Sequence, residues 1–102
     1  MSVSLQVMYP AKAETTFDHN YYLSTHMDLL DKHMGAHIAS TVVTKGLAGA
    51  DDAPAGYHVI ATILFKDQAA FGAAMAAAAP VVADISEFYS GTPEMLVGEV
   101  VG

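Results

Sequence analysis

The chain of 102 residues contains no cysteine. Without thiols it cannot form disulfide bonds, use a cysteine nucleophile or bind a metal through sulfur. Any chemistry that the protein performs must therefore come from imidazole, carboxyl, hydroxyl or amide groups.

Basic side chains are also scarce. Four lysines and no arginine face 11 acidic residues, which gives a formal net charge of -7. Such a surface repels phosphate backbones, so we expect no nucleic acid partner. The chain also lacks an arginine fork and a glycine-rich phosphate loop, which disfavours nucleotide cofactors such as FAD and NAD.

Long apolar runs are missing too. The least polar stretch, residues 69–83, is mostly alanine and is interrupted by Pro80, so we expect no membrane-spanning segment and no membrane partner. The first residues lack the basic segment and apolar run of a signal peptide. These absences predict a cytoplasmic protein.

Apolar material is plentiful in spite of these gaps, since 53% of the residues are hydrophobic. A chain of this length and composition can build one compact core, so we expect a single domain over residues 1–102.

The spacing of apolar residues predicts six main elements. Strict alternation indicates a first strand that Pro10 ends, and helical spacing follows, with Asp18 in the first turn and Gly35 as the stop. Asp67 is placed to cap a second helix of strong helix formers. The expected strands are residues 3–9, 38–47, 57–66 and 95–101; the expected helices are residues 17–34 and 68–79, with a short helical piece from Pro80.

This order predicts an α+β domain of the ferredoxin-like βαββαβ kind, with an antiparallel four-stranded sheet and the helices on one face. The third strand is nevertheless apolar on both faces, with Val59 and Phe65 on one face and Ile60 and Leu64 on the other. A face that helices leave uncovered needs a partner, so we expect a homodimer. A monomer that tolerates an apolar patch is the alternative.

The core face of the first helix is unusually rich in polar rings. At about 100° per residue, one stripe collects His19, Tyr22, Leu23, His26, Leu29, Leu30 and His33. The three histidines lie about two turns apart, too far to bind one metal ion together, so we expect no metal site.

His26 is the candidate for chemistry, because it lies in the middle of this stripe. A partly buried imidazole in a cavity can transfer a proton or polarise a carbonyl group, and Tyr22 one turn earlier can supply a second hydrogen-bond donor. The alternative is a structural histidine that is satisfied within the core. His19 and His33, near the helix ends, are expected to be solvated or capping residues.

Several residues are candidates for the wall of a cavity. Asp84 lies in an apolar segment and is either a pocket acid or a cap for the backbone that follows, and the pattern favours the cap. His58 is expected on the face of its strand opposite Phe65, toward the dimer interface. The aromatic residues expected in the core or lining a cavity for a flat apolar ligand are Tyr9, Phe65, Phe71, Phe88 and Tyr89.

Several motifs in chain order resemble the EthD family. The first half contributes Tyr9-Pro10, Phe17-Asp18, Tyr21-Tyr22-x-x-x-His26 and Lys45-Gly46-Leu47. The second half contributes Phe65-x-x-x-x-Ala70-Phe71, Ala83-Asp84-Ile85-x-x-Phe88, Pro93 and Gly98-Glu99-Val100. The family often has proline two residues after its motif histidine, where this chain has Asp28. This carboxylate lies on another helix face but can raise the pKa of His26 through space.

The resemblance implies a dimeric α/β barrel, and related barrels include cofactor-free monooxygenases, cyclases, isomerases and haem-binding enzymes. The fold alone does not choose among these activities. Our leading hypothesis is a small-molecule enzyme or accessory protein of catabolic or secondary metabolism that binds an apolar carbonyl compound between the first helix and the sheet, without a cofactor. In that reading His26 and Tyr22 are catalytic, and Tyr9, Phe65, Asp84, Phe88 and Tyr89 bind the substrate. A non-catalytic carrier for a partner oxygenase and a haem-binding variant are the alternatives.

Overall fold

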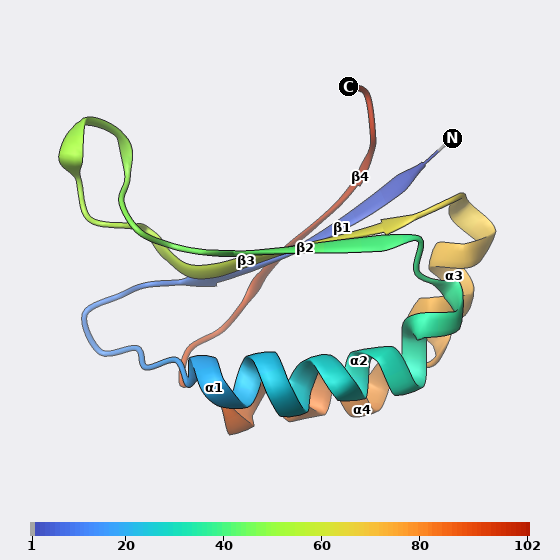
Figure 1. Ribbon diagram of the computed structural model, residues 1–102, viewed down its shortest axis with the longest axis horizontal. Coiled ribbons are helices and arrows are strands. Elements are labelled where there is room, and N and C mark those ends of the chain that lie inside the picture. Colours follow the sequence, from blue (N-terminus) through green and yellow to red (C-terminus); the bar gives the residue numbers. More distant parts are fainter. Residues whose placement is uncertain (1) are drawn as a thin grey trace.

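A computed structural model describes residues 2–102 of the chain. One antiparallel sheet is covered on one face by helices, and Figure 1 shows its other face bare. The strands are β1 (Val3–Pro10), β2 (Ser40–Lys45), β3 (Tyr57–Phe65) and β4 (Glu94–Glu99); the helices are α1 (His19–Tyr21), α2 (Met27–Met34), α3 (Gln68–Ala76) and α4 (Ala79–Ala83), with shorter turns between them.

The strand order β2-β3-β1-β4 confirms the ferredoxin-like arrangement. The central strands β1 and β3 alternate as expected: Val3, Leu5, Val7 and Tyr9 are buried beneath the helices, and so are the odd-numbered residues 59–65 of β3. In the register, Val7 lies between Ala61 of β3 and Met95 of β4. The sheet therefore offers an apolar floor to the helical layer.

The first helix is continuous from His19 to Met34 but is not uniform. The turn from Tyr22 to His26 is a π-helix between α1 and α2, and the N–H of Met27 donates to the carbonyl of Tyr22. Asp18 precedes the helix as its N-cap and accepts a hydrogen bond from the Tyr21 N–H, so the helix starts two residues later than predicted.

The buried stripe of this helix runs at intervals of four residues through Tyr22, His26, Leu30 and Met34. Leu23, predicted on the core face, is 62% exposed instead. A π-turn winds less per residue than an α-helix, so a projection at uniform α-helical spacing misplaces residues around it. The prediction was correct for Tyr22 and His26 and wrong for Leu23.

Helices α3 and α4 form the rest of the cover. Asp67 caps α3 by accepting from the N–H of Ala70, as predicted, and Pro80 lies in the first turn of α4. In residues 2–102 no single helix is long and apolar enough to cross a membrane. One pair, Gln68–Ala76 with Ala79–Glu87, passes that test only jointly and is bent by 60°.

The outer face of the sheet carries both apolar and polar side chains. The Thr62 hydroxyl donates to the side-chain oxygen of Gln6 at 3.1 Å in the middle of this face. Apolar side chains surround the pair on all four strands, namely Met8, Val42, Ile60, Leu64 and Leu96. No other part of the described chain covers this face (Figure 1).

His58 does not point away from the helices as predicted. The pairing of β1 with β3 shifts between Tyr9 and Pro10, and His58 has no partner across this bulge. Bulges redirect side chains, and the His58 ring stacks on Phe17 with centroids 5.7 Å apart. Its Nε2 lies 2.9 Å from the Thr15 hydroxyl, so His58 is part of the aromatic cluster on the helical side.

Candidate functional site

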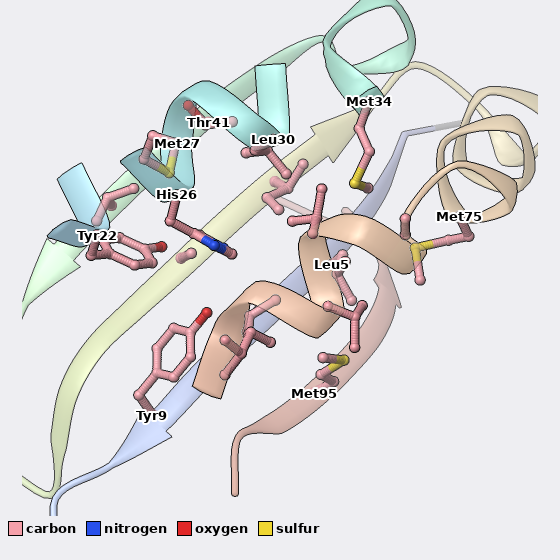
Figure 2. A pocket seen from close by; sticks show the side chains of 18 residues that line it. Leu5, Tyr9, Tyr22, His26, Met27, Leu30, Met34, Thr41, Met75 and Met95 are labelled. Atoms are coloured by element: carbon pink, nitrogen blue, oxygen red, sulfur yellow. The ribbon is translucent and has the colours of Figure 1, made fainter. Parts of the chain in front are cut away.

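A cavity of about 50 Å³ lies between the helices and the sheet. Its walls are apolar apart from Thr41 and from one end, where Tyr9, Tyr22 and His26 meet (Figure 2). Figure 2 also shows the sulfur atoms of Met34, Met75 and Met95 toward the opposite end. The remaining lining residues are Leu5, Val7, Met27, Leu30, Thr41, Val43, Ala61, Ile63, Ala78, Val81, Val82 and Ile85.

The polar end is built around His26, whose side chain is 6% exposed. Its Nδ1 lies 3.0 Å from Oδ2 of Asp84, and the other carboxylate oxygen, Oδ1, accepts a hydrogen bond of 2.7 Å from the Tyr21 hydroxyl. One carboxylate therefore joins two side chains of the first helix to the turn that follows α4. This arrangement fixes the orientation of the imidazole ring.

The hydrogen bond also sets the tautomer of His26. A carboxylate only accepts hydrogen bonds, so the ring proton lies on Nδ1 and Nε2 keeps its lone pair. Burial lowers the pKa of His26 from its ordinary value of 6.5, and the Asp84 carboxylate opposes this change without reversing it. The imidazole is therefore uncharged at neutral pH and its free nitrogen can accept a proton.

Two tyrosine hydroxyls lie beside this imidazole. The Tyr22 and His26 rings stack with centroids 5.3 Å apart, and Tyr9 packs edge-on against Tyr22 at 5.8 Å. Burial raises the pKa of Tyr22 to about 12, and burial together with the Tyr22 hydroxyl raises the pKa of Tyr9 further above its ordinary range. Both phenols remain protonated, so both can donate hydrogen bonds into the cavity.

Of the seven site residues predicted from the sequence, Tyr9, Tyr22 and His26 line the cavity. Phe88 supports them from outside the cavity, with its ring centroid 4.5 Å from that of His26. Tyr89 packs against Tyr9, and its hydroxyl donates to the carbonyl of Pro10 at 2.7 Å. These two aromatic residues hold the site in place and do not form its wall.

Phe65 is not brought to the cavity. It is fully buried near the start of α3, where it packs against Phe71 with ring centroids 5.4 Å apart. Its place on β3 puts it at the far end of the helix-facing side of the sheet from Tyr9, because it pairs with Val3 at the beginning of β1. The structure gives it a place in the core.

Two predictions about carboxylates need correction. The Asp84 side chain does not cap the backbone that follows it; its oxygens accept from His26 and Tyr21 instead. Asp28, which from its place in the sequence could raise the pKa of His26, is exposed on the outer side of α2, and the carboxylate that does so is Asp84. The partners of Asp84 are 58 and 63 positions away, so no local sequence pattern indicates them.

Sequence analysis missed Tyr21 and the methionine-rich wall. Tyr21 projects to the outer arc of a uniform helix, and only its contact with Asp84 shows a role. Four methionines line the cavity, at positions 27, 34, 75 and 95. Flexible, polarisable thioethers of this kind fill irregular space and adapt to different ligand shapes. Met75 and Met95 lie in apolar stretches, whereas Met27 stands between His26 and Asp28, so the four positions share no signal in the sequence.

The described residues do not form a typical metal or haem site. Within residues 2–102, no three histidine or acidic side chains gather where they could hold a metal ion. A cavity of about 50 Å³ is also far smaller than the roughly 300 Å³ at which pockets for larger ligands begin, so a porphyrin does not fit it as it stands. The chemistry that this site offers is that of an imidazole and two phenols.

Comparison with known proteins places this site in a family. The EthD domain matches residues 12–92. An EthD-like protein from Ralstonia eutropha is 32% identical with a TM-score of 0.88, covering 99% of this chain and 93% of its own. An ethyl tert-butyl ether d (EthD) family protein from Bacillus halodurans is 18% identical with a TM-score of 0.76, covering 99% of this chain and 100% of its own.

A more distant structure shares the fold alone. SnoaB, a cofactor-independent oxygenase from Streptomyces nogalater, is 11% identical with a TM-score of 0.63, and the match covers 99% of this chain and 94% of that one. No curated protein is similar enough to count as a match. The family match and the Ralstonia structure together show that the chain belongs to the EthD domain family.

Proposed function

We propose that this protein is a small-molecule enzyme that moves a proton on an apolar, carbonyl-bearing compound held between the first helix and the sheet. The observation that carries the proposal is the state of His26: an uncharged imidazole, fixed at Nδ1 by Asp84, with a free Nε2 at the one polar end of an apolar cavity. Such a nitrogen is a general base that works near neutral pH.

The proposed step assigns a role to each polar group. The C–H bond next to the carbonyl breaks, its proton moves to Nε2 of His26, and its electron pair shifts onto the carbonyl oxygen to form an enolate. Tyr22 and Tyr9 donate hydrogen bonds to that oxygen as its negative charge develops. Asp84 is a positioning residue, and its carboxylate stabilises the imidazolium that results.

The fate of the enolate decides the reaction class. Return of the proton to a different atom gives an isomer, and attack by the enolate on a second carbonyl closes a ring; neither needs a redox co-reactant. Capture of the enolate by dioxygen leads to oxygenation, with dioxygen as the oxidant. SnoaB, described as a cofactor-independent oxygenase, shares this fold, which supports testing the oxygenation reaction as well.

The ligand follows from the charges around the cavity. None of the four lysines lines it, and its polar groups are uncharged at neutral pH. An anionic ligand would therefore lose its hydration without gaining an ion pair. The lining favours a neutral, flat, apolar compound with one hydrogen-bond acceptor.

Hydrogen exchange in deuterated water tests this proposal. Wild-type protein should accelerate exchange of the protons next to the carbonyl of cyclohexanone or α-tetralone, followed by NMR. His26→Ala should lose this acceleration by roughly a hundredfold, the scale of general-base catalysis. His33→Ala, a partly exposed position further along the same helix, is the matched control. If both ketones bind but their exchange is not accelerated, the protein is not an enzyme of this kind. The result would favour a carrier that delivers its ligand to a partner oxygenase.

A further inference from the structure

The cavity beside His26 is not isolated from the surface. A groove of about 190 Å³ runs between α2 and β2, lined by Met27, Leu30, Asp31, Gly35, Ile38, Ser40 and Thr41. Three of these residues, Met27, Leu30 and Thr41, also line the cavity beside His26. A single layer of side chains therefore separates the two hollows.

The cavity beside His26 is too small to hold a whole substrate. Its volume of about 50 Å³ has room for only a few water molecules, whereas pockets for larger ligands measure roughly 300 to 1,000 Å³. A carbonyl group beside Nε2 of His26 fills most of that space, and the rest of the molecule needs room elsewhere. The adjoining groove, of about 190 Å³, is the larger of the two hollows.

Of the three shared side chains, Met27 is the most able to move. Leu30 is buried in the stripe that holds the helix on the sheet, and Thr41 is short. Met27 is unbranched, only partly buried, and follows directly after the π-turn, where the regular helical hydrogen bonding is interrupted. A change in its rotamer joins the cavity to the groove.

We propose that the groove between α2 and β2 is the outer compartment of the ligand site and that Met27 is the movable partition in front of it. This inference rests on the proposed function, because it takes the cavity as the place of the reacting carbonyl. The outer rim carries the Asp31 carboxylate and the hydroxyls of Ser40 and Thr41. The ligand is therefore an elongated apolar compound with an acceptor at its inner end and a hydrogen-bond donor at its outer end.

A competing route exists on the opposite flank. Val82 of α4 and Met95 of β4 also line the cavity, and they are 48% and 46% exposed. The groove that shares three lining residues with the cavity lies on the side of α2 and β2. Opening each flank separately distinguishes the two routes.

The absence of cysteine makes access measurable. A thiol introduced by Ala61→Cys lies on the cavity floor, since Ala61 is 5% exposed. Its modification by methyl methanethiosulfonate, a small neutral reagent, can be followed by mass spectrometry. Met27→Ala should accelerate this labelling on the order of tenfold, and Met95→Ala should leave it nearly unchanged. Faster labelling with Met95→Ala alone would place the route between α4 and β4 and overturn the inference.

A second introduced thiol serves as the control for global unfolding. Ala74→Cys is buried in the same helical layer, with Ala74 0% exposed, and lines neither hollow. Its labelling rate reports unfolding alone, so the ratio of the two rates measures local opening. If Met27→Ala raises the labelling rate equally at both positions, the variant has lost stability and Met27 is not a movable partition. That result would also overturn the inference.

The ligand class is tested with two neutral ketones, acetonaphthone and an analogue with a hydroxyl at the far end of the rings. Calorimetry should show that Asp31→Ala weakens binding of the hydroxylated ketone about tenfold and leaves the parent unchanged. Equal effects on both would remove Asp31 from the site. If neither ketone binds wild-type protein, the proposed function loses its ligand, while the labelling rates still decide the route independently.

Discussion

Nδ1 of His26 lies 3.0 Å from Oδ2 of Asp84, and this hydrogen bond joins the middle of the first helix to the turn after α4. The second carboxylate oxygen is held by the Tyr21 hydroxyl, so Asp84 cannot turn away without losing a partner. A residue with two fixed partners in a partly buried place orients the base and tunes its basicity together.

Removing this carboxylate should weaken the base. The hydrogen bond and charge of Asp84 raise the pKa of His26, against burial, which lowers it by more. Asp84→Ala should therefore lower the pKa of His26 still further, as measured by NMR titration of the imidazole ring protons. Tyr21→Phe, which keeps the carboxylate, should have a smaller effect. A higher pKa in Asp84→Ala would show that Asp84 does not support the charged imidazole.

Stability should depend on pH through the same residue. The pKa of His26 in the folded protein lies below its ordinary value of 6.5, so the unfolded chain binds the proton more readily. The contribution to stability is therefore complete above pH 6.5 and is lost as the pH falls from there through the folded pKa. Urea unfolding between pH 5 and about 8 should show this slope.

His26→Gln should remove that part of the slope. The other histidines are more exposed. The pKa of His19 is also lowered, first by burial and then by Lys45. A double substitution that adds His19→Gln therefore separates the two contributions. An unchanged slope in His26→Gln would contradict a buried, uncharged imidazole.

Sequence patterns predicted the sheet well because its alternation is local. Val3, Leu5, Val7 and Tyr9 are all buried on the face that period two assigns them. Strand ends were less accurate: β2 and β4 are shorter than predicted, with β4 ending at Glu99. The existence and order of the elements follow from patterning, whereas their ends depend on pairing with neighbouring strands.

The site was predicted only in part, for two physical reasons. The π-turn at residues 22–26 is a property of the backbone, so uniform spacing placed Leu23 inward when it points outward. The pairing of Asp84 with His26 arises from packing between distant segments, which no spacing rule describes. His26 itself was identified because a polar ring in the middle of an apolar stripe is visible in the sequence alone.

The uncovered apolar face of the sheet predicts a homodimer. Ile60→Lys would place a charge among Met8 and the other apolar side chains of this face, at a cost of several kcal/mol in a dry interface. Light scattering should give a dimer for wild type and monomers or aggregates for Ile60→Lys. Leu47→Lys, at an exposed position outside the strands, is the control. A monomeric wild type at micromolar concentration would remove the prediction.

Metal removal should leave the folded protein unaffected. The histidines of the first helix lie about two turns apart and do not converge. No acidic or histidine cluster in residues 2–102 could hold an ion. Treatment with a chelator should therefore not change Tm in a thermal melt. One tightly held zinc or iron per chain, found by elemental analysis, would contradict this expectation.

His26→Gln separates a catalytic from a structural histidine. Glutamine keeps a polar side chain of similar length but cannot take up a proton near neutral pH. If His26 is the base, hydrogen exchange of a bound ketone should fall sharply, and Tm should change little, because the amide can still donate to Asp84. Binding of Prodan, a neutral naphthyl ketone whose fluorescence reports its surroundings, should remain.

If His26 is only a structural residue, His26→Gln should lower stability and leave ligand binding unchanged. The glutamine amide would leave part of the buried polar network unsatisfied, at a cost of about 1 to 3 kcal/mol in the free energy of unfolding, and ligand affinity would stay as in wild type. Phe88 distinguishes the two cases, because it packs on the His26 ring without lining the cavity. Phe88→Leu should lower Tm while exchange per folded molecule persists. Lower stability in His26→Gln with exchange intact would therefore rule out His26 as the base.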